Sequence, residues 1–158
     1  MKIGVLTALF HDRDFESMIK YLHSIGVQAV ELASGGYPGK YHIDPEALLK
    51  TPEKIDEIKA VIDKYGMAIS AVSAHGNPLH PDKATAKQFH DDFINAILFA
   101  EKLGVDTIVG FSGCPGDHDG AKYPNWVTCP WPNDFLDILD WQWNEVLIPY
   151  WKNLVEFA

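Results

Sequence analysis

Three short segments of the chain share one pattern, in which a glycine follows a helical stretch and opens an apolar run. They begin at Gly26, Gly66 and Gly104, so consecutive copies lie 40 and 38 residues apart. Glycine can adopt the left-handed conformation that ends a helix and turns the chain back towards a sheet. A repeat of this length is typical of a βα unit, so the pattern predicts parallel strands covered by helices.

Four apolar runs are predicted to be strands that are buried on both faces, namely residues 2–9, 28–32, 67–72 and 106–109. Helical spacing of apolar residues follows each of the first three runs, through Phe15, Ile55 and Phe89. A fourth helix is expected to start near Asn133, and Pro149 should kink or divide it. The order of elements is therefore α/β, with four successive βα units.

Two architectures contain such units: an open doubly wound sheet, and part of a (βα)₈ barrel, which typically needs about 250 residues. The open sheet usually carries a glycine-rich phosphate loop in its first βα turn. That turn, residues 9–14, contains no glycine here. Gly35 and Gly36 follow the second strand but lead into a loop, so a flexible turn is a better interpretation than a nucleotide site.

The charge of the chain argues against two classes of partner. The formal net charge of its 158 residues is −9, which excludes the basic footprint of a nucleic-acid binder and disfavours an anionic membrane surface. No apolar run reaches the length of about 18 residues that would indicate a membrane span. Cys114 and Cys129 are too few for a disulfide framework, so a reducing cytoplasm is the expected compartment.

Residues at the carboxyl ends of the strands are the candidate site, because parallel α/β proteins bind ligands there. Glu31 lies inside an apolar run, and a buried carboxylate needs a polar partner. It therefore points into a polar barrel mouth or forms a structural salt bridge. His75 directly follows the third strand and suits proton transfer, hydroxyl recognition or metal binding. The alternative for His75 is a hydrogen bond within its own loop.

A long stretch without predicted elements, residues 111–132, follows the fourth strand, and loops of this length are often functional. It carries Tyr123 and Trp126, whose flat faces suit the C–H faces of a sugar ring. The competing interpretation is that these aromatic side chains fill a small core of the loop itself.

Several of these segments together resemble the sugar phosphate isomerase/epimerase family of the xylose-isomerase-like TIM-barrel superfamily. They are residues 1–5, 30–36, 73–78 and 111–113, with two aromatic and proline-rich stretches at 123–126 and 129–132. The resemblance implies a (βα)₈ barrel of parallel strands. Residues 1–158 would then be the (βα)₄ N-terminal half of a single barrel domain, because the sequence stops inside its fourth helix.

The resemblance also implies a chemistry. Members of this family hold a divalent metal (Mn, Mg, Co or Zn), and two metal-bound glutamates move a proton at a carbon next to a carbonyl. Their ligands follow strands five to eight, so no catalytic or metal residue is assignable in this half, which alone should be inactive. In a related branch, the endonuclease-IV-like barrels, His75 would match a zinc ligand. The expected substrate-binding residues are Glu31, His75, Asn77, Phe111, Ser112, Tyr123 and Trp126.

Two other functions remain open. One is a non-catalytic half-barrel that binds a sugar or assembles, for example as a homo-oligomer, through its unpaired strand edges. The other is a dehydratase or lyase that acts on an inositol or a sugar acid. In each case the expected partner is a small sugar-like molecule, with no nucleic acid and no membrane.

Overall fold

The computed structural model describes all 158 residues, and the chain divides into two compact units. The first contains residues 1–75 and 91–110, and the second contains residues 76–90 and 111–158. The expectation of a single half-barrel domain over residues 1–158 stays a prediction. None of the helices combines the length and the hydropathy that crossing a membrane requires.

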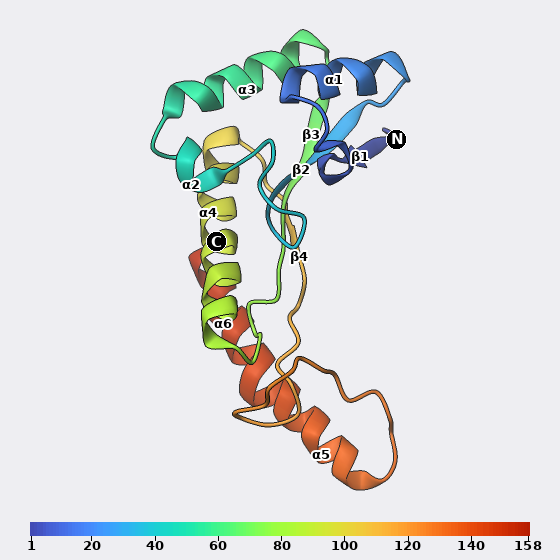
Figure 1. Ribbon diagram of the computed structural model, residues 1–158, viewed down its shortest axis with the longest axis vertical. Helices are drawn as coiled ribbons and strands as arrows, with labels where there is room; N and C mark the ends of the chain where they lie inside the picture. Colours follow the sequence, from blue (N-terminus) through green and yellow to red (C-terminus); the bar gives the residue numbers. More distant parts are fainter. The chain divides into compact units, whose positions relative to one another are not determined.

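The sheet of the first unit has four parallel strands in the order of the sequence (Figure 1). They are β1 (Gly4–Leu6), β2 (Ala29–Gly36), β3 (Ala68–His75) and β4 (Ile108–Gly110). β2 and β3 are the long central pair, and β1 and β4 are the edges. Each strand therefore pairs with its neighbour in the sequence, as the repeated βα units predict.

The helices of the first unit bury one apolar face each. α1 (Phe15–Ser24), α2 (Pro45–Leu48) and α3 (Pro52–Lys64) lie wholly in this unit, and α4 (Lys83–Leu103) runs through both. The N-cap Asp14 accepts a hydrogen bond of 2.9 Å from the Ser17 N–H, which satisfies a free donor of the first turn. The buried apolar side chains of these helices include Met18, Ile19, Leu22, Ile55, Ile58, Ile62, Phe93, Ala96 and Phe99.

The three glycines of the repeat have the predicted left-handed conformation. Their φ angles are 87° at Gly26, 61° at Gly66 and 75° at Gly104. An added Cβ would meet no atom within 4 Å at any of them. Glycine is required there for the backbone conformation and not for space, because L side chains disfavour positive φ.

The strand bounds differ from the predicted ones. Strand 2–9 is too long, because the chain turns into a 3₁₀ helix, η1 (Thr7–Phe10), directly after β1. β2 and β3 instead run past their apolar runs, to Gly36 and to His75. Small and polar residues extend both strands because they still form the ladder, in which Gly36 is the register partner of His75.

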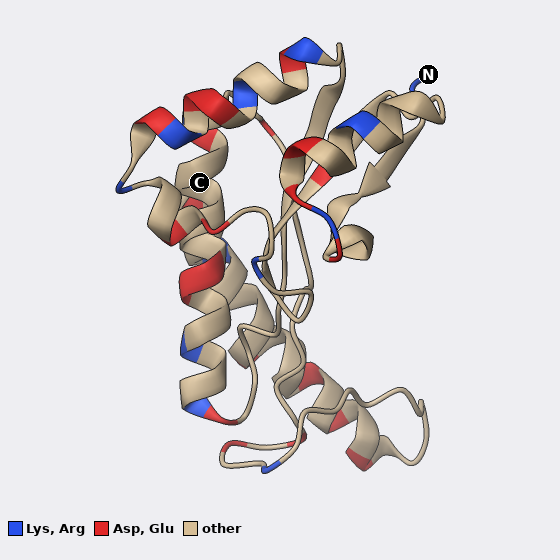
Figure 2. Cartoon of the chain, turned by 45° about the horizontal axis from the view of Figure 1, so that its top comes forward, with Lys and Arg blue, Asp and Glu red and all other residues tan.

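The second unit contains a helical stretch that starts at Asn133, as predicted. It comprises α5 (Asn133–Trp141), a π-helical segment η2 (Gln142–Leu147) and α6 (Ile148–Phe157). The division falls in the turns before Pro149, because the wider π segment accommodates a residue that lacks an N–H. α5 carries acidic segments and no basic ones (Figure 2).

Candidate functional site

Glu31 and His75 lie on the neighbouring strands β2 and β3, and their side chains meet. Glu31 Oε1 is 3.7 Å from His75 Nε2, and the two side chains are 26% and 14% exposed. The carboxylate therefore has the polar partner that a partly buried charge requires. The pair places a carboxylate acceptor beside a ring nitrogen. Both side chains remain accessible enough to form hydrogen bonds with the hydroxyl groups of a ligand.

Three buried hydroxyl groups surround this part of the sheet, and all of them hold the backbone. Thr7 Oγ1 accepts from the Ala33 N–H at 2.9 Å. Ser34 Oγ donates to the Ser73 carbonyl at 3.0 Å, and Ser73 Oγ donates to the Leu32 carbonyl at 3.4 Å. These hydroxyl groups fix the strands beside the Glu31–His75 pair.

Sequence reasoning missed an ion pair in the same unit, between Lys40 in the loop after β2 and Asp92 on α4. Lys40 Nζ is 2.7 Å from Asp92 Oδ1, and the Asp92 side chain is 5% exposed. Burial opposes the charge of Lys40, but the hydrogen bond and the charge of Asp92 outweigh it and hold the lysine pKa above its ordinary value. A carboxylate three positions after Phe89 on an apolar helix stripe was the available signal.

No group of three or more His, Cys, Asp or Glu side chains is arranged to hold a metal ion. Glu31 and His75 offer only two metal-ligating groups, whereas metal sites in proteins use at least three protein ligands or several waters. The expectation that no metal ligand of the family lies in this half stays a prediction.

Asn77, in the second unit, uses its amide to join two loops. Its Nδ2 donates to the Cys114 carbonyl at 2.9 Å, and its Oδ1 accepts from the Cys114 N–H at 2.8 Å and from the Leu79 N–H at 3.1 Å. The side chain is buried. Burial also raises the pKa of the Cys114 thiol, which disfavours a nucleophilic role for it.

The other four predicted substrate-binding residues lie in the second unit as well. The Ser112 carbonyl accepts from Trp151 Nε1 at 2.7 Å, and Phe111 is half-exposed. Tyr123 is exposed, with Lys122 Nζ 5.1 Å from its ring centre. The Trp126 ring packs at 5.8 Å against the ring of Trp143. A sugar-binding role for these residues stays a prediction.

Gln142 is a second residue that sequence reasoning missed, and it organises the long loop. Its side chain is fully buried at the start of η2. Nε2 donates to the carbonyls of Gly116 at 2.6 Å and Asn125 at 3.0 Å, and Oε1 accepts from the Val127 N–H at 3.2 Å. The loop segment 116–127 forms no strand pairing, so these hydrogen bonds to a single side chain hold its backbone in place. No local sequence pattern marks it.

Tyr150 on α6 is half-buried, with its hydroxyl 3.1 Å from His90 Nδ1. Burial raises the pKa of Tyr150 to about 12, because the phenolate would be poorly solvated.

We expect one of the six tyrosines to ionise late in an absorbance titration at 295 nm, near pH 12, and the late step to disappear in Tyr150→Phe. A free tyrosine ionises near pH 10, so the unfolded chain releases this proton first. Tyr150 should therefore cost stability progressively as the pH rises from about 10 to about 12. Equal slopes of stability against pH in the two proteins would contradict this.

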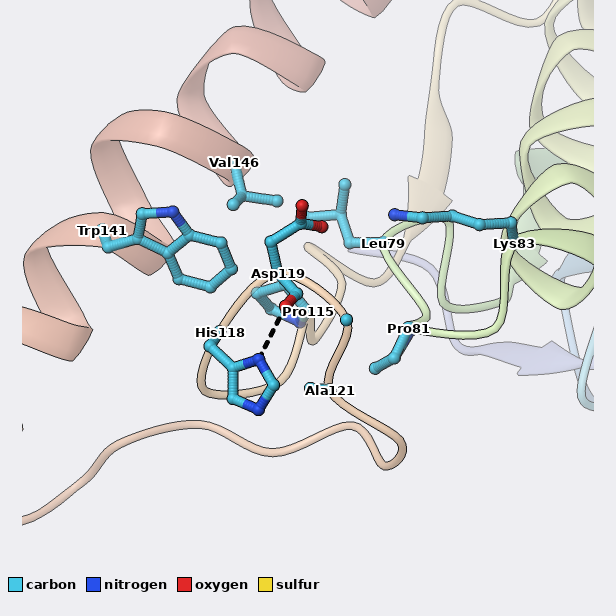
Figure 3. A pocket seen from close by; sticks show the side chains of 10 residues that line it. Leu79, Pro81, Lys83, Pro115, His118, Asp119, Ala121, Trp141 and Val146 are labelled. Carbon is cyan, nitrogen blue, oxygen red and sulfur yellow. Dashed lines mark hydrogen bonds between the residues drawn. The ribbon is translucent and has the colours of Figure 1, made fainter.

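A small cavity of about 70 Å³ lies in the second unit. Trp141, Lys83 and Asp119 line it, and His118 Nδ1 donates to the Asp119 carbonyl at 2.7 Å beside it (Figure 3). None of the seven predicted substrate-binding residues lines this cavity.

Comparison with known proteins identifies the class of fold. Residues 19–157 match the family described as xylose isomerase-like TIM barrel. The crystal structure of the 3-keto-D-glucoside 4-epimerase YcjR from E. coli, in its apo form, has a TM-score of 0.53 and 14% identity. The match covers 99% of this chain and 52% of that one. The chain belongs to the xylose isomerase-like TIM barrel family, and the predicted half-barrel of four parallel βα units is confirmed.

A curated relative is closer in sequence. The chain is 34% identical over 160 residues to the uncharacterized protein YfiH of Bacillus subtilis (strain 168). The match covers 100% of this chain and 51% of YfiH, so the chain spans about half the length of that relative.

Proposed function

We propose that this chain is the N-terminal half of a metal-dependent sugar isomerase or epimerase, which moves a proton at a carbon next to a carbonyl. Membership of the xylose isomerase-like family supports the proposal, because it gives the chain the fold that this chemistry uses. The observation that carries the proposal for this half is the contact between Glu31 and His75, two accessible polar groups on adjacent strands.

In this proposal, Glu31 and His75 orient the substrate. The carboxylate accepts a hydrogen bond from one sugar hydroxyl, and His75 Nε2 forms a hydrogen bond with a second hydroxyl. The sugar ring is thereby held in one orientation. Hydrogen bonds to charged groups contribute about 1.5–3 kcal/mol. The metal and the two proton-moving carboxylates would come from the second half of the barrel.

The test measures proton movement directly, on the full-length protein that carries this chain as its first half. Each of a panel of ketoses, with and without phosphate, is incubated in D₂O, and ¹H NMR follows deuterium entry at the carbon next to the carbonyl. We expect exchange with at least one sugar, loss of exchange after chelation, and recovery with Mn²⁺.

Glu31→Gln should lower kcat/KM about tenfold, because about 1.4 kcal/mol of substrate stabilisation is lost. Glu53→Gln is the matched control, since Glu53 is exposed in the first turn of α3. Equal kcat/KM values for Glu31→Gln and the unmodified protein would remove Glu31 from the site. Sugar binding without exchange would favour the non-catalytic half-barrel, and a product that has lost water would favour a dehydratase.

A further inference from the structure

Asp92 is an acid in an apolar setting, and its two oxygens are both engaged. It lies on α4 between the buried residues Phe89 and Ala96, and its side chain is 5% exposed. Oδ1 pairs with Lys40 Nζ at 2.7 Å, and Oδ2 accepts from the Gly36 N–H at 2.9 Å. Burying a carboxylate costs free energy of folding unless partners such as these bond its oxygens.

The end of β2 is shaped to admit this carboxylate. A Cβ on Gly35 would lie 2.9 Å from Asp92 Cβ and Cγ and 3.0 Å from Oδ2, closer than real Cβ contacts allow. The missing side chain therefore lets the strand approach α4. Gly36 follows with a φ of 80°, which turns the chain out of the strand and aims its N–H at Asp92.

The bond from Asp92 acts at the level of His75. Gly36 is the register partner of His75, and the Tyr37 N–H donates to the His75 carbonyl at 2.9 Å. β2 is irregular between Ala33 and Gly35, so the ladder alone leaves freedom in the register between Glu31 and the end of the strand. Asp92 and Lys40 together fix the two ends of the turn that follows, residues 36–40.

We propose that Asp92 is a positioning residue, which holds the end of β2 against β3 and so keeps Glu31 and His75 in contact. The proposal rests on the proposed function for its biological meaning, because Glu31 and His75 are the substrate-orienting groups there. The carboxylate oxygens bond Lys40 Nζ and the Gly36 N–H. Its effect passes through the backbone of Gly36 and His75.

The test measures whether the NMR signal of the His75 ring still depends on the Glu31 carboxylate. In the 158-residue chain with ¹³C-labelled histidine, the ring signal of His75 is assigned by its loss in His75→Gln. Glu31→Gln should displace this signal, because the two groups are 3.7 Å apart. The displacement is then measured in two backgrounds, Lys40→Met with Asp92→Asn, and Lys40→Met with Asp92→Leu.

Both backgrounds remove the ion pair without leaving a buried charge, but only asparagine keeps an acceptor for the Gly36 N–H. We expect the displacement to persist with Asp92→Asn and to fall by at least half with Asp92→Leu. Glu101→Gln, exposed on the same helix, should leave it unchanged. Equal displacements in the asparagine and leucine backgrounds would overturn the proposal.

A second measurement needs no variant. The Gly36 amide should exchange with D₂O at least a hundredfold more slowly than an unprotected amide, and free exchange there would also overturn the proposal. These readouts need no substrate. A chain with intact Glu31–His75 coupling but no sugar chemistry in its full-length protein would therefore contradict the proposed function alone.

Discussion

Replacing Gln142 by leucine should lower the free energy of unfolding by about 3 kcal/mol, because it leaves buried backbone groups without partners. The carbonyls of Gly116 and Asn125 and the Val127 N–H all bond this one side chain. Leucine is similar in volume but offers neither donor nor acceptor. Urea denaturation followed by far-UV circular dichroism measures the loss, and proteolysis should cut the loop at residues 117–132 faster.

Gln88→Leu is the matched control, because Gln88 is exposed on α4. It should change stability by no more than about 0.5 kcal/mol. If Gln142→Leu also stayed within that range, the long loop would have to be held by its own side chains and not by Gln142.

Gly110→Ala should destabilise the chain by about 3 kcal/mol, through overpacking. A Cβ at this position in β4 would overlap the ring of Phe93, which is buried on α4. Phe93 is 3% exposed, so its ring cannot move away without displacing core atoms. The midpoint of urea denaturation measures the change.

Gly4→Ala provides the comparison, because it makes the same chemical change in another edge strand. Its Cβ would meet Ala29 Cβ at 3.5 Å, an ordinary contact, so little stability should be lost. The double variant Gly110→Ala with Phe93→Leu should recover part of the loss. Equal costs at Gly110 and Gly4 would mean that lost backbone freedom, and not the overlap with Phe93, sets the penalty.

Local signals were sufficient to predict the positions of the four strands, because a strand covered on both faces must be apolar throughout. They failed at the strand ends. Ser34 and Gly36 are not strand formers, and they extend β2 because β3 and α4 offer partners to their polar groups. Tertiary hydrogen bonds of this kind leave no trace in a window of ten residues.

The residues of the candidate site were likewise predictable only in part. Glu31 and His75 were identifiable because a carboxylate in an apolar run and a histidine at a strand end are unusual. The position of Asp92 on an apolar helix stripe marked it as unusual, but its pairing with Lys40, 52 residues away, could not be predicted. The bonds of Gln142 reach residues 15 to 26 positions away and had no local signal. Residues that position others are defined by long-range contacts, which a single sequence does not reveal.

The sequential strand order has a consequence for how the sheet assembles. Paired residues are only 25, 39 and 36 positions apart in the chain, as at Gly4 and Ala29, Ala29 and Ala68, and Val72 and Ile108. Because the entropy cost of closing a loop grows only slowly with its length, each pairing closes at nearly the same cost. Loop closure therefore favours none of the three pairings, whereas the ladder between β2 and β3 is the longest. We expect this pair to nucleate the fold and each outer βα unit to add to one of its edges.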